Sequence, residues 1–129
     1  MAYANDVLDS KILIIDDDQY IVRLLCAYLN AEGFTNVCSV TDSRQAMDEC
    51  IRIDPDLIIL DIFMPHIDGF ALMEKIKDLW PISHNVMILT FLDEPATRTK
   101  ALESGARDFL AKPFDRAEAV EKVRQALAK

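Results

Sequence analysis

Five polar residues stand at the ends of short apolar segments of the sequence. Two acids follow 11–15, one acid follows 57–60, a threonine follows 86–89 and a lysine follows 108–111; they are Asp16, Asp17, Asp61, Thr90 and Lys112. Three carboxylates held close together repel one another, and a hard divalent cation such as Mg²⁺ is their expected companion. A lysine and a hydroxyl beside them would stabilise a transferring phosphoryl group, and an aspartate can be the nucleophile that attacks phosphorus. These residue types predict Mg²⁺-dependent phosphoryl chemistry, with Asp61 as the reactive group.

The segment before Asp61 indicates how these residues could meet. Leu57 to Leu60 are apolar without alternation, which is typical of a strand buried on both faces of a helix-covered parallel sheet. Parallel strands bring their carboxyl ends to one edge, and the ligand sites of such sheets lie beyond that edge. We therefore expect the five polar residues to lie together there.

Strand-like and helix-like segments alternate along the chain. We expect strands at 11–15, 37–40, 57–60, 86–89 and 108–111. We expect helices over 19–31, from residue 42 or 43 to 53, over 70–80 and 95–104, and after residue 115. The apolar faces of these helices include Ile51, Leu79 and Leu127, which we expect to be buried. The alternation predicts an α/β fold with a five-stranded parallel sheet, right-handed crossovers and helices on both faces.

Composition limits the classes to which the protein can belong. With 129 residues, of which 51% are hydrophobic, the chain is expected to form one compact domain. Its net charge of −8 disfavours direct binding to nucleic acid or to an anionic membrane. Cys26, Cys38 and Cys50 lack metal-ligand spacing and are expected to be free thiols in a reducing cytosol. No apolar run suits a transmembrane helix or a signal peptide, so we predict a cytoplasmic protein.

Four separated motifs resemble one known family. Residues 14–18 (IIDDD), 56–69 (DLIILDIFMPHIDG), 88–90 (ILT) and 105–114 (GARDFLAKPF) are similar, in order and spacing, to the receiver domain of two-component response regulators. The resemblance implies a flavodoxin-like (βα)5 fold with strand order 2-1-3-4-5. We therefore predict a receiver domain over 11–129, preceded by an N-terminal extension over 1–10.

The resemblance implies a phosphoryl transfer and assigns its parts. A histidine kinase or a histidine phosphotransfer protein would donate the phosphoryl group to Asp61. Asp17 and Asp61 would bind Mg²⁺ directly, together with the backbone carbonyl of Phe63. Asp16 would act mainly through a metal-bound water. The domain would be a phosphoacceptor that assists its own phosphorylation and dephosphorylation, and not an enzyme.

The resemblance also implies a conformational response. Lys112 would pair with the phosphoryl oxygens, Thr90 would hydrogen-bond one of them, and Phe109 would move when Thr90 moves. The change would reach the surface of the fourth helix, the fifth strand and the fifth helix, a face through which two copies of the chain could pair. A downstream protein or an attached output domain would read it, and the chain could be a stand-alone receiver or part of a longer protein. The Lys112–Pro113 peptide bond would be cis.

Apolar side chains near the expected site bear on access and lifetime. Many receivers have a small residue after the threonine, whereas this chain has Phe91 followed by Leu92. We expect Phe91 to crowd the path of an entering phosphoryl donor. Phe63 and Leu92 offer no hydrogen bond to a hydrolytic water, which predicts slow loss of the phosphoryl group.

Two other functions stay open on the sequence alone. A Mg²⁺-dependent phosphohydrolase also passes through an aspartyl phosphate, but such enzymes commonly have an acid two residues after the nucleophile, where this chain has Phe63. A receiver-like interaction module that is never phosphorylated would not need Asp61, Thr90 and Lys112 together. The bulk of Phe91 is the one feature that favours such a module.

Overall fold

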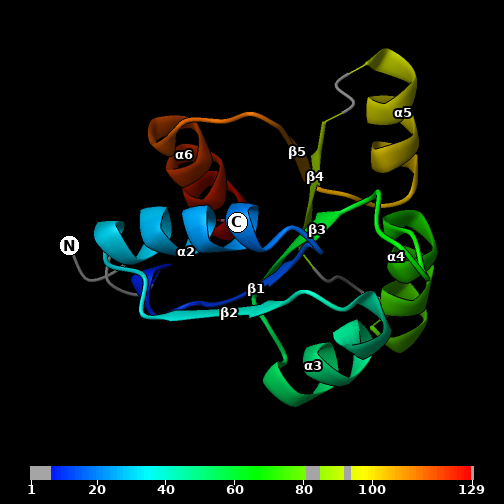
Figure 1. The fold of residues 1–129 in the computed structure, drawn as a ribbon, viewed down its shortest axis with the longest axis horizontal. Coiled ribbons are helices and arrows are strands. Elements are labelled where there is room, and N and C mark those ends of the chain that lie inside the picture. Colours follow the sequence, from blue (N-terminus) through cyan, green and yellow to red (C-terminus); the bar gives the residue numbers. More distant parts are fainter. Residues whose placement is uncertain (1–6, 81–84, 92–93, 129) are drawn as a thin grey trace.

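The computed structural model describes residues 7–80, 85–91 and 94–128, which are built on a five-stranded parallel sheet. The strands are β1 (Lys11–Ile15), β2 (Asn36–Val40), β3 (Leu57–Asp61), β4 (Val86–Thr90) and β5 (Asp108–Ala111). Their spatial order is β2-β1-β3-β4-β5 (Figure 1). The predicted sheet and its strand order are confirmed.

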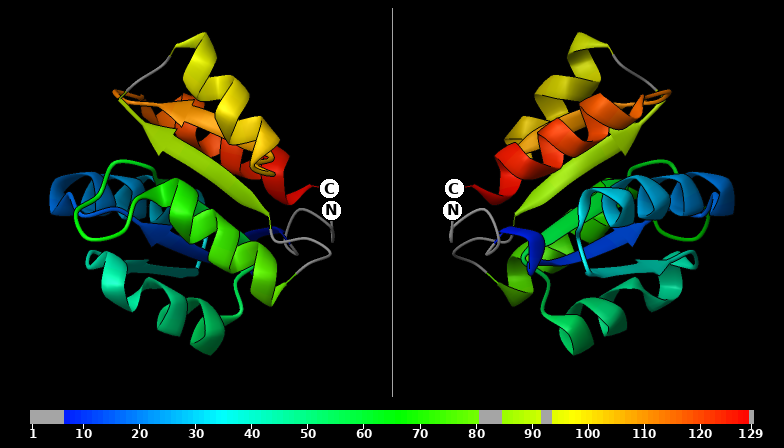
Figure 2. Two further views of the ribbon diagram at one scale, coloured as in Figure 1. Left: turned by 90° about the vertical axis from the view of Figure 1, so that its right-hand side faces the viewer. Right: turned by 90° about the vertical axis from the view of Figure 1, so that its left-hand side faces the viewer.

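Helices cover both faces of the sheet, as the views in Figure 2 show. One face carries α2 (Gln19–Glu32) and α6 (Arg116–Leu127), and the other carries α3 (Ala46–Ile53), α4 (Gly69–Leu79) and α5 (Pro95–Glu103). A short 3₁₀ turn, Ser43–Gln45, precedes α3. Within the described part of the chain, no helix combines the length and the apolar character needed to cross a membrane.

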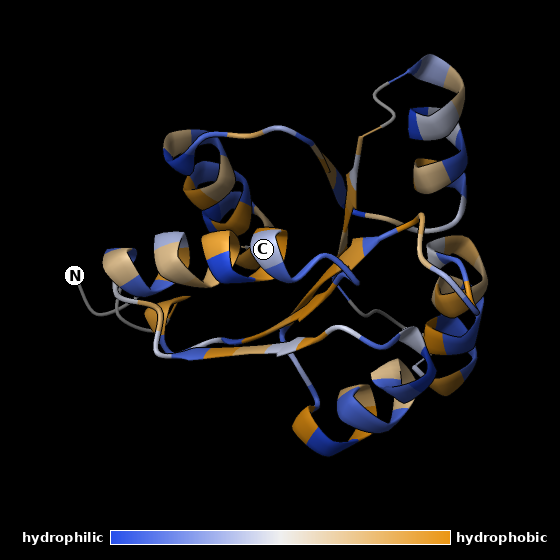
Figure 3. Ribbon diagram, viewed as in Figure 1, coloured by the Kyte–Doolittle hydropathy of each residue, from blue (hydrophilic) through white to orange (hydrophobic). Residues whose placement is uncertain are grey.

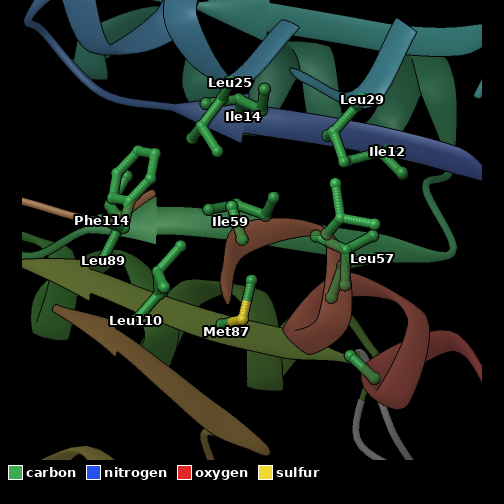
Figure 4. Close-up of a cluster of buried hydrophobic side chains, with 14 of the residues drawn as sticks. Ile12, Ile14, Leu25, Leu29, Leu57, Ile59, Met87, Leu89, Leu110 and Phe114 are labelled. Atoms are coloured by element: carbon green, nitrogen blue, oxygen red, sulfur yellow. The ribbon is translucent and has the colours of Figure 1, made fainter. Parts of the chain in front are cut away.

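Two apolar layers form the core because successive residues of a strand point to opposite faces. Figure 4 shows the layer beneath α2 and α6, in which Leu25, Leu29 and Phe114 meet alternate residues of the strands. These strand residues are Ile12, Ile14, Leu57, Ile59, Met87, Leu89 and Leu110. Their sequence neighbours, such as Ile58 and Leu60, fill the layer on the other face. Covering of both faces explains why the central strands β3 and β4 are buried at every position and are largely apolar, as Figure 3 shows, whereas the edge strand β2 is more polar.

Local signals fix the ends of the helices. The carboxylates of Asp18 and Asp115 accept hydrogen bonds from backbone N–H groups in the first turns of α2 and α6. α2 ends at Gly33, whose φ of 108° lies in the left-handed region that glycine adopts most easily. Asp18 therefore has a structural role as a helix cap, next to the acids at the end of β1.

Two positions predicted to be buried are exposed, and both predictions are wrong. Ile51 is 56% exposed because α3 buries Cys50, and the next residue lies about 100° further round the helix. Leu79 is 44% exposed because α4 buries no residue after Ile76. Leu127 is half-buried against the layer beneath α2 and α6. The errors fall at the borders of apolar stripes and leave the sheet unaffected.

Candidate functional site

Three acids meet at the carboxyl edge of the sheet. Ile15 of β1 pairs with Leu60 of β3, so the residues that follow them, Asp16 and Asp61, lie at the same level. Oxygen atoms of the Asp16, Asp17 and Asp61 carboxylates all lie within 4.8 Å of one another. Asp16 and Asp61 are buried, whereas Asp17 is exposed. The structure thus brings the three predicted acids into one group that opens to solvent at Asp17.

Lys112 reaches this acid group from the end of β5. Its Nζ lies 2.8 Å from Oδ2 of Asp16 and 3.6 Å from Oδ2 of Asp61, and its side chain is 1% exposed. The backbone N–H of Lys112 donates to the carbonyl oxygen of Thr90 at 2.7 Å, which continues the pairing of β4 and β5 past the strand end. The Lys112–Pro113 bond is cis, as the resemblance implies. The ammonium group is therefore inside the site and closer to Asp16 than to Asp61.

The Asp61 carboxyl group has an unusual affinity for protons. Burial is the main cause and the neighbouring Asp16 carboxylate the second, and together they raise the pKa of Asp61 to about 7. The positive charge of Lys112 acts in the opposite direction but does not cancel them. The Phe63 backbone N–H, which donates to Asp61 Oδ1 at 3.2 Å, also favours the ionised form. The site therefore holds more negative charge than one lysine neutralises.

The acid group has the donors that Mg²⁺ prefers, which are carboxylate oxygens with room for water. Oδ2 of Asp16 is buried and pairs with Lys112 as an ion, without a well-directed hydrogen bond. Asp17 leaves one side of the group open to solvent. Within residues 7–80, 85–91 and 94–128, no second group of three acids, histidines or cysteines lies close enough together to hold a metal ion. The residues present therefore fit a hard divalent cation.

The loop after β3 is held closely against the site. A Cβ atom on Gly69 would lie 2.5 Å from the Cα of Ile62 and 2.6 Å from the carbonyl oxygen of Asp61, so only glycine fits at the start of α4. The hydroxyl of Ser43 donates to the carbonyl oxygen of Pro65 at 2.7 Å. Sequence reasoning missed Ser43 as a support for this loop, because a serine there signals only the start of a helix.

Two exposed aromatic side chains flank the acid group. Phe63 is 55% exposed and Phe91 is 68% exposed. The Phe91 ring covers the ammonium group of Lys112, and its centroid lies 4.7 Å from Nζ. The sequence predicts that Phe91 lies beside the site but gives no signal for this contact, which depends on the directions of two side chains. Leu92 lies outside the described residues.

The two residues predicted to form the switch are both buried. Thr90 ends β4 and is fully buried, and Phe109 in β5 is 4% exposed. The guanidinium group of Arg98, from α5, lies over the Phe109 ring with its Cζ 4.6 Å from the centroid. Sequence reasoning missed Arg98, because helical spacing indicates only that this residue faces outward. Phe109 is thus connected to α5 through a charged side chain.

The cysteines offer no comparable chemistry. Cys26, Cys38 and Cys50 are free thiols. Burial raises the pKa of Cys50 to about 12, so this thiol stays protonated at neutral pH and is a poor nucleophile. The cysteines therefore give no second candidate site among the described residues.

Comparison with known proteins gives consistent matches. Residues 12–124 match the family described as "Response regulator receiver domain". The chain is 42% identical over 109 residues to the response regulator PleD of Caulobacter vibrioides, covering 84% of this chain and 24% of PleD. It is 32% identical over 120 residues to the alkaline phosphatase synthesis transcriptional regulatory protein PhoP of Bacillus subtilis, covering 93% of this chain and 49% of PhoP.

A solved structure of similar size agrees with these matches. A two-component response regulator from Clostridium difficile superposes with a TM-score of 0.85 at 28% identity, covering 94% of this chain and 98% of that one. The chain spans about a quarter of the length of PleD and about half that of PhoP.

Proposed function

Because this chain belongs to the response regulator receiver domain family, we propose that its Asp61 accepts a phosphoryl group from a histidine kinase or a histidine phosphotransfer protein. The observation that carries the proposal is the position of Asp61, a buried carboxylate at a strand end with Lys112 Nζ 3.6 Å away and two further acids beside it. This combination gives a nucleophile, a cation for the incoming charge and donors for a metal ion.

The transfer follows from these groups. An Asp61 carboxylate oxygen attacks phosphorus, and the new O–P bond forms as the P–N bond of the donor phosphohistidine breaks. The histidine nitrogen leaves with the bonding electron pair and takes up a proton. Lys112 stabilises the charge on the phosphoryl oxygens, and the hydroxyl of Thr90 is the partner for one of them.

Mg²⁺ is the cofactor that the acid group supports, and when bound it supplies charge neutralisation for the phosphoryl oxygens. Asp17 and Asp61 would hold it directly with the backbone carbonyl of Phe63, and Asp16 would act through a bound water. Asp18 has no part in this, since its carboxylate caps α2. The raised pKa of Asp61 gives a physical reason for the requirement, because a nearby cation favours the ionised nucleophile.

The response to phosphorylation would pass through Thr90 and Phe109 to α5, β5 and α6. A phosphoryl group adds a charge of about −1.5 to −2, and Thr90 is positioned at the end of the strand next to Asp61. Phe109 is covered by Arg98 of α5, so movement of the aromatic ring changes the packing of that helix. A downstream protein, an attached output domain or a second copy of this chain would recognise the altered surface.

The rival functions receive less support. The family match and the (βα)5 fold do not favour a phosphohydrolase, and Phe63 occupies the position at which such enzymes commonly have an acid. An interaction module that is never phosphorylated would not need a buried lysine between two buried acids, an arrangement with a high desolvation cost. We therefore treat the domain as a phosphoacceptor that assists its own phosphorylation and dephosphorylation.

Intact-protein mass spectrometry tests the assignment of Asp61. The wild type should gain the mass of one phosphoryl group from a phosphorylated histidine kinase, or from acetyl phosphate, in the presence of Mg²⁺, and Asp61→Asn should not. Asp78→Asn, which removes an exposed acid of α4, is the matched control and should behave as the wild type. Phosphorylation of Asp61→Asn at the normal rate would contradict the proposal.

A further inference from the structure

Phe91 occupies a position that core packing does not explain. Phe91 is 68% exposed and belongs to neither apolar layer of the core. Such a ring gains little from removal of apolar surface from water. Its contact within the site is with a charge, the ammonium group of Lys112, whose Nζ lies 4.7 Å from the ring centroid.

The surroundings of Lys112 show what the ring does there. Nζ lies 2.8 Å from Asp16 Oδ2, whereas the 3.6 Å to Asp61 Oδ2 is longer than a charged hydrogen bond. An ammonium group has three N–H donors, so the ion pair with Asp16 leaves donors for a further partner. The lysine is therefore held between Asp16 and the Phe91 ring, just short of the candidate phosphoacceptor.

We propose that Phe91 is a positioning residue for Lys112. The face of its ring holds the ammonium group by a cation–π contact and shields it from water, so that the cation is already in place for a phosphoryl group on Asp61. This rests on the proposed function of Asp61. A phosphoryl group would extend oxygens from the carboxylate toward Nζ and close the remaining gap. Cation–π attraction strengthens as the cation loses water, and the Lys112 side chain is 1% exposed.

Two substitutions of Phe91 separate the effect of its aromatic face from the effect of its size. Phe91→Leu keeps an apolar side chain but has no π face, whereas Phe91→Tyr keeps the face. The access role predicted from the sequence depends on bulk, so it is largely retained in Phe91→Leu. The positioning role is lost in that variant.

Isothermal titration calorimetry in the presence of Mg²⁺ measures the affinity of each variant for beryllofluoride, a phosphoryl mimic. Phe91→Leu should bind beryllofluoride about three- to tenfold more weakly than the wild type, and Phe91→Tyr should bind within about twofold of it. NMR tests the contact itself. The ε-methylene protons of Lys112 should be shielded by the ring current in the wild type and in Phe91→Tyr, and the ammonium protons of Lys112 should exchange with water faster in Phe91→Leu alone.

Each outcome decides one question. Urea unfolding should show that both variants remain folded with a cooperative transition, and that Phe91→Leu loses no more stability than the cation–π contact itself contributes. Wild-type affinity in Phe91→Leu overturns the positioning role, and so do equal losses in both variants, because shape would then be the cause. A wild type that binds no beryllofluoride contradicts the proposed function of Asp61 itself and this proposal with it.

Discussion

The helix layer formed by α2 and α6 and the single helix α5 are attached to the same sheet in different ways. α2 buries Ile21, Val22, Leu25 and Leu29, and α6 buries Ala119, Val120, Val123 and Ala126. Glu32 at the end of α2 also pairs with Arg116 at 3.2 Å and Arg124 at 3.1 Å, both from α6. By contrast, α5 buries only Thr97 and Ala101 and leaves its Leu102 60% exposed.

Charged contacts with aromatic rings take the place of an apolar stripe on α5. Arg98 lies over Phe109, and Lys100 Nζ lies 4.4 Å from the centroid of the Phe70 ring. Such contacts contribute about 0.5–2 kcal/mol each, less than a buried leucine. From this difference we expect the α2–α6 layer to hold the sheet and its acids in place. We expect α5, which contacts the predicted switch residue Phe109, to move at a smaller free-energy cost.

The contrast predicts unequal effects of two leucine truncations. Leu25→Ala removes a fully buried side chain from the α2–α6 layer and should lower the free energy of unfolding by about 2–5 kcal/mol. Leu102→Ala removes an exposed side chain from α5 and should change it by less than about 0.5 kcal/mol. Urea unfolding followed by circular dichroism measures both. Similar losses in the two variants would show that α5 is anchored as firmly as α2.

The pH dependence of the free energy of unfolding reports on the acid group and not on the packing of the helices. The pKa of Asp61 is raised from an ordinary 3.8 to about 7, so the fold favours the protonated carboxyl group. Its contribution to stability is complete below about pH 4 and is lost as the pH rises through about 7. Without metal, Asp61→Asn should therefore be more stable than the wild type at pH 8, by on the order of 1–3 kcal/mol.

Urea unfolding between pH 4 and pH 8 provides the test. The wild type should lose stability over this range relative to Asp61→Asn, and Mg²⁺ should restore it in the wild type alone, because a bound ligand stabilises the folded state. Asp78→Asn on the exposed side of α4 should follow the wild type at every pH. If the free energies of unfolding of the wild type and Asp61→Asn change with pH in the same way, groups other than Asp61 cause the pH dependence.

Hydrogen exchange can show whether Arg98 holds α5 in place. Arg98→Gln removes the charge over Phe109 and should speed amide exchange in α5 about two- to fivefold, the equivalent of a contact of 0.5–1 kcal/mol. Exchange in α2 should not change. Arg23→Gln, at an exposed position of α2, is the matched control. Unchanged exchange in α5 would mean that Arg98 does not restrain this helix.

The sequence predicts the sheet and the acid group well because both depend on local patterns. β1, β3, β4 and β5 are mostly apolar runs that end in a polar residue or are followed at once by one. Parallel pairing, in the strand order that the resemblance implies, then brings Asp16, Asp61 and Lys112 together. The small number of buried residues in α5 also agrees with its sequence, which has few apolar residues between Pro95 and Glu103.

Contacts between side chains from distant segments could not be predicted in this way. Phe91 and Lys112 belong to different strand ends, and Arg98 and Phe109 belong to a helix and a strand. Their contacts depend on rotamers and on how far one element lies from another, which no local spacing specifies. The misplaced Ile51 has a related cause, since spacing locates the centre of an apolar stripe better than its border.

Phe63 allows a final test of whether the α5 side of the site controls the lifetime of the phosphoryl group. Phe63 lines a hollow of about 340 Å³ together with Phe70, Thr97 and Lys100, of which Thr97 and Lys100 belong to α5. An apolar ring there cannot hold a water molecule for attack on an aspartyl phosphate. Phe63→Asn supplies a hydrogen bond and should shorten the lifetime about two- to fivefold, as expected for a bond of 0.5–1 kcal/mol.

Phe63→Leu is the matched apolar control, and the decay of phosphorylated protein by intact mass spectrometry measures both variants. If Phe63→Asn and Phe63→Leu shorten the lifetime equally, loss of bulk and not the held water is the cause. If neither changes it, the hydrolytic water does not approach from the side of α5. A faster decay in Phe63→Asn alone would mean that the hydrolytic water approaches Asp61 from the side of α5. The helix that we expect to respond to phosphorylation would then also border the route by which the phosphoryl group is lost.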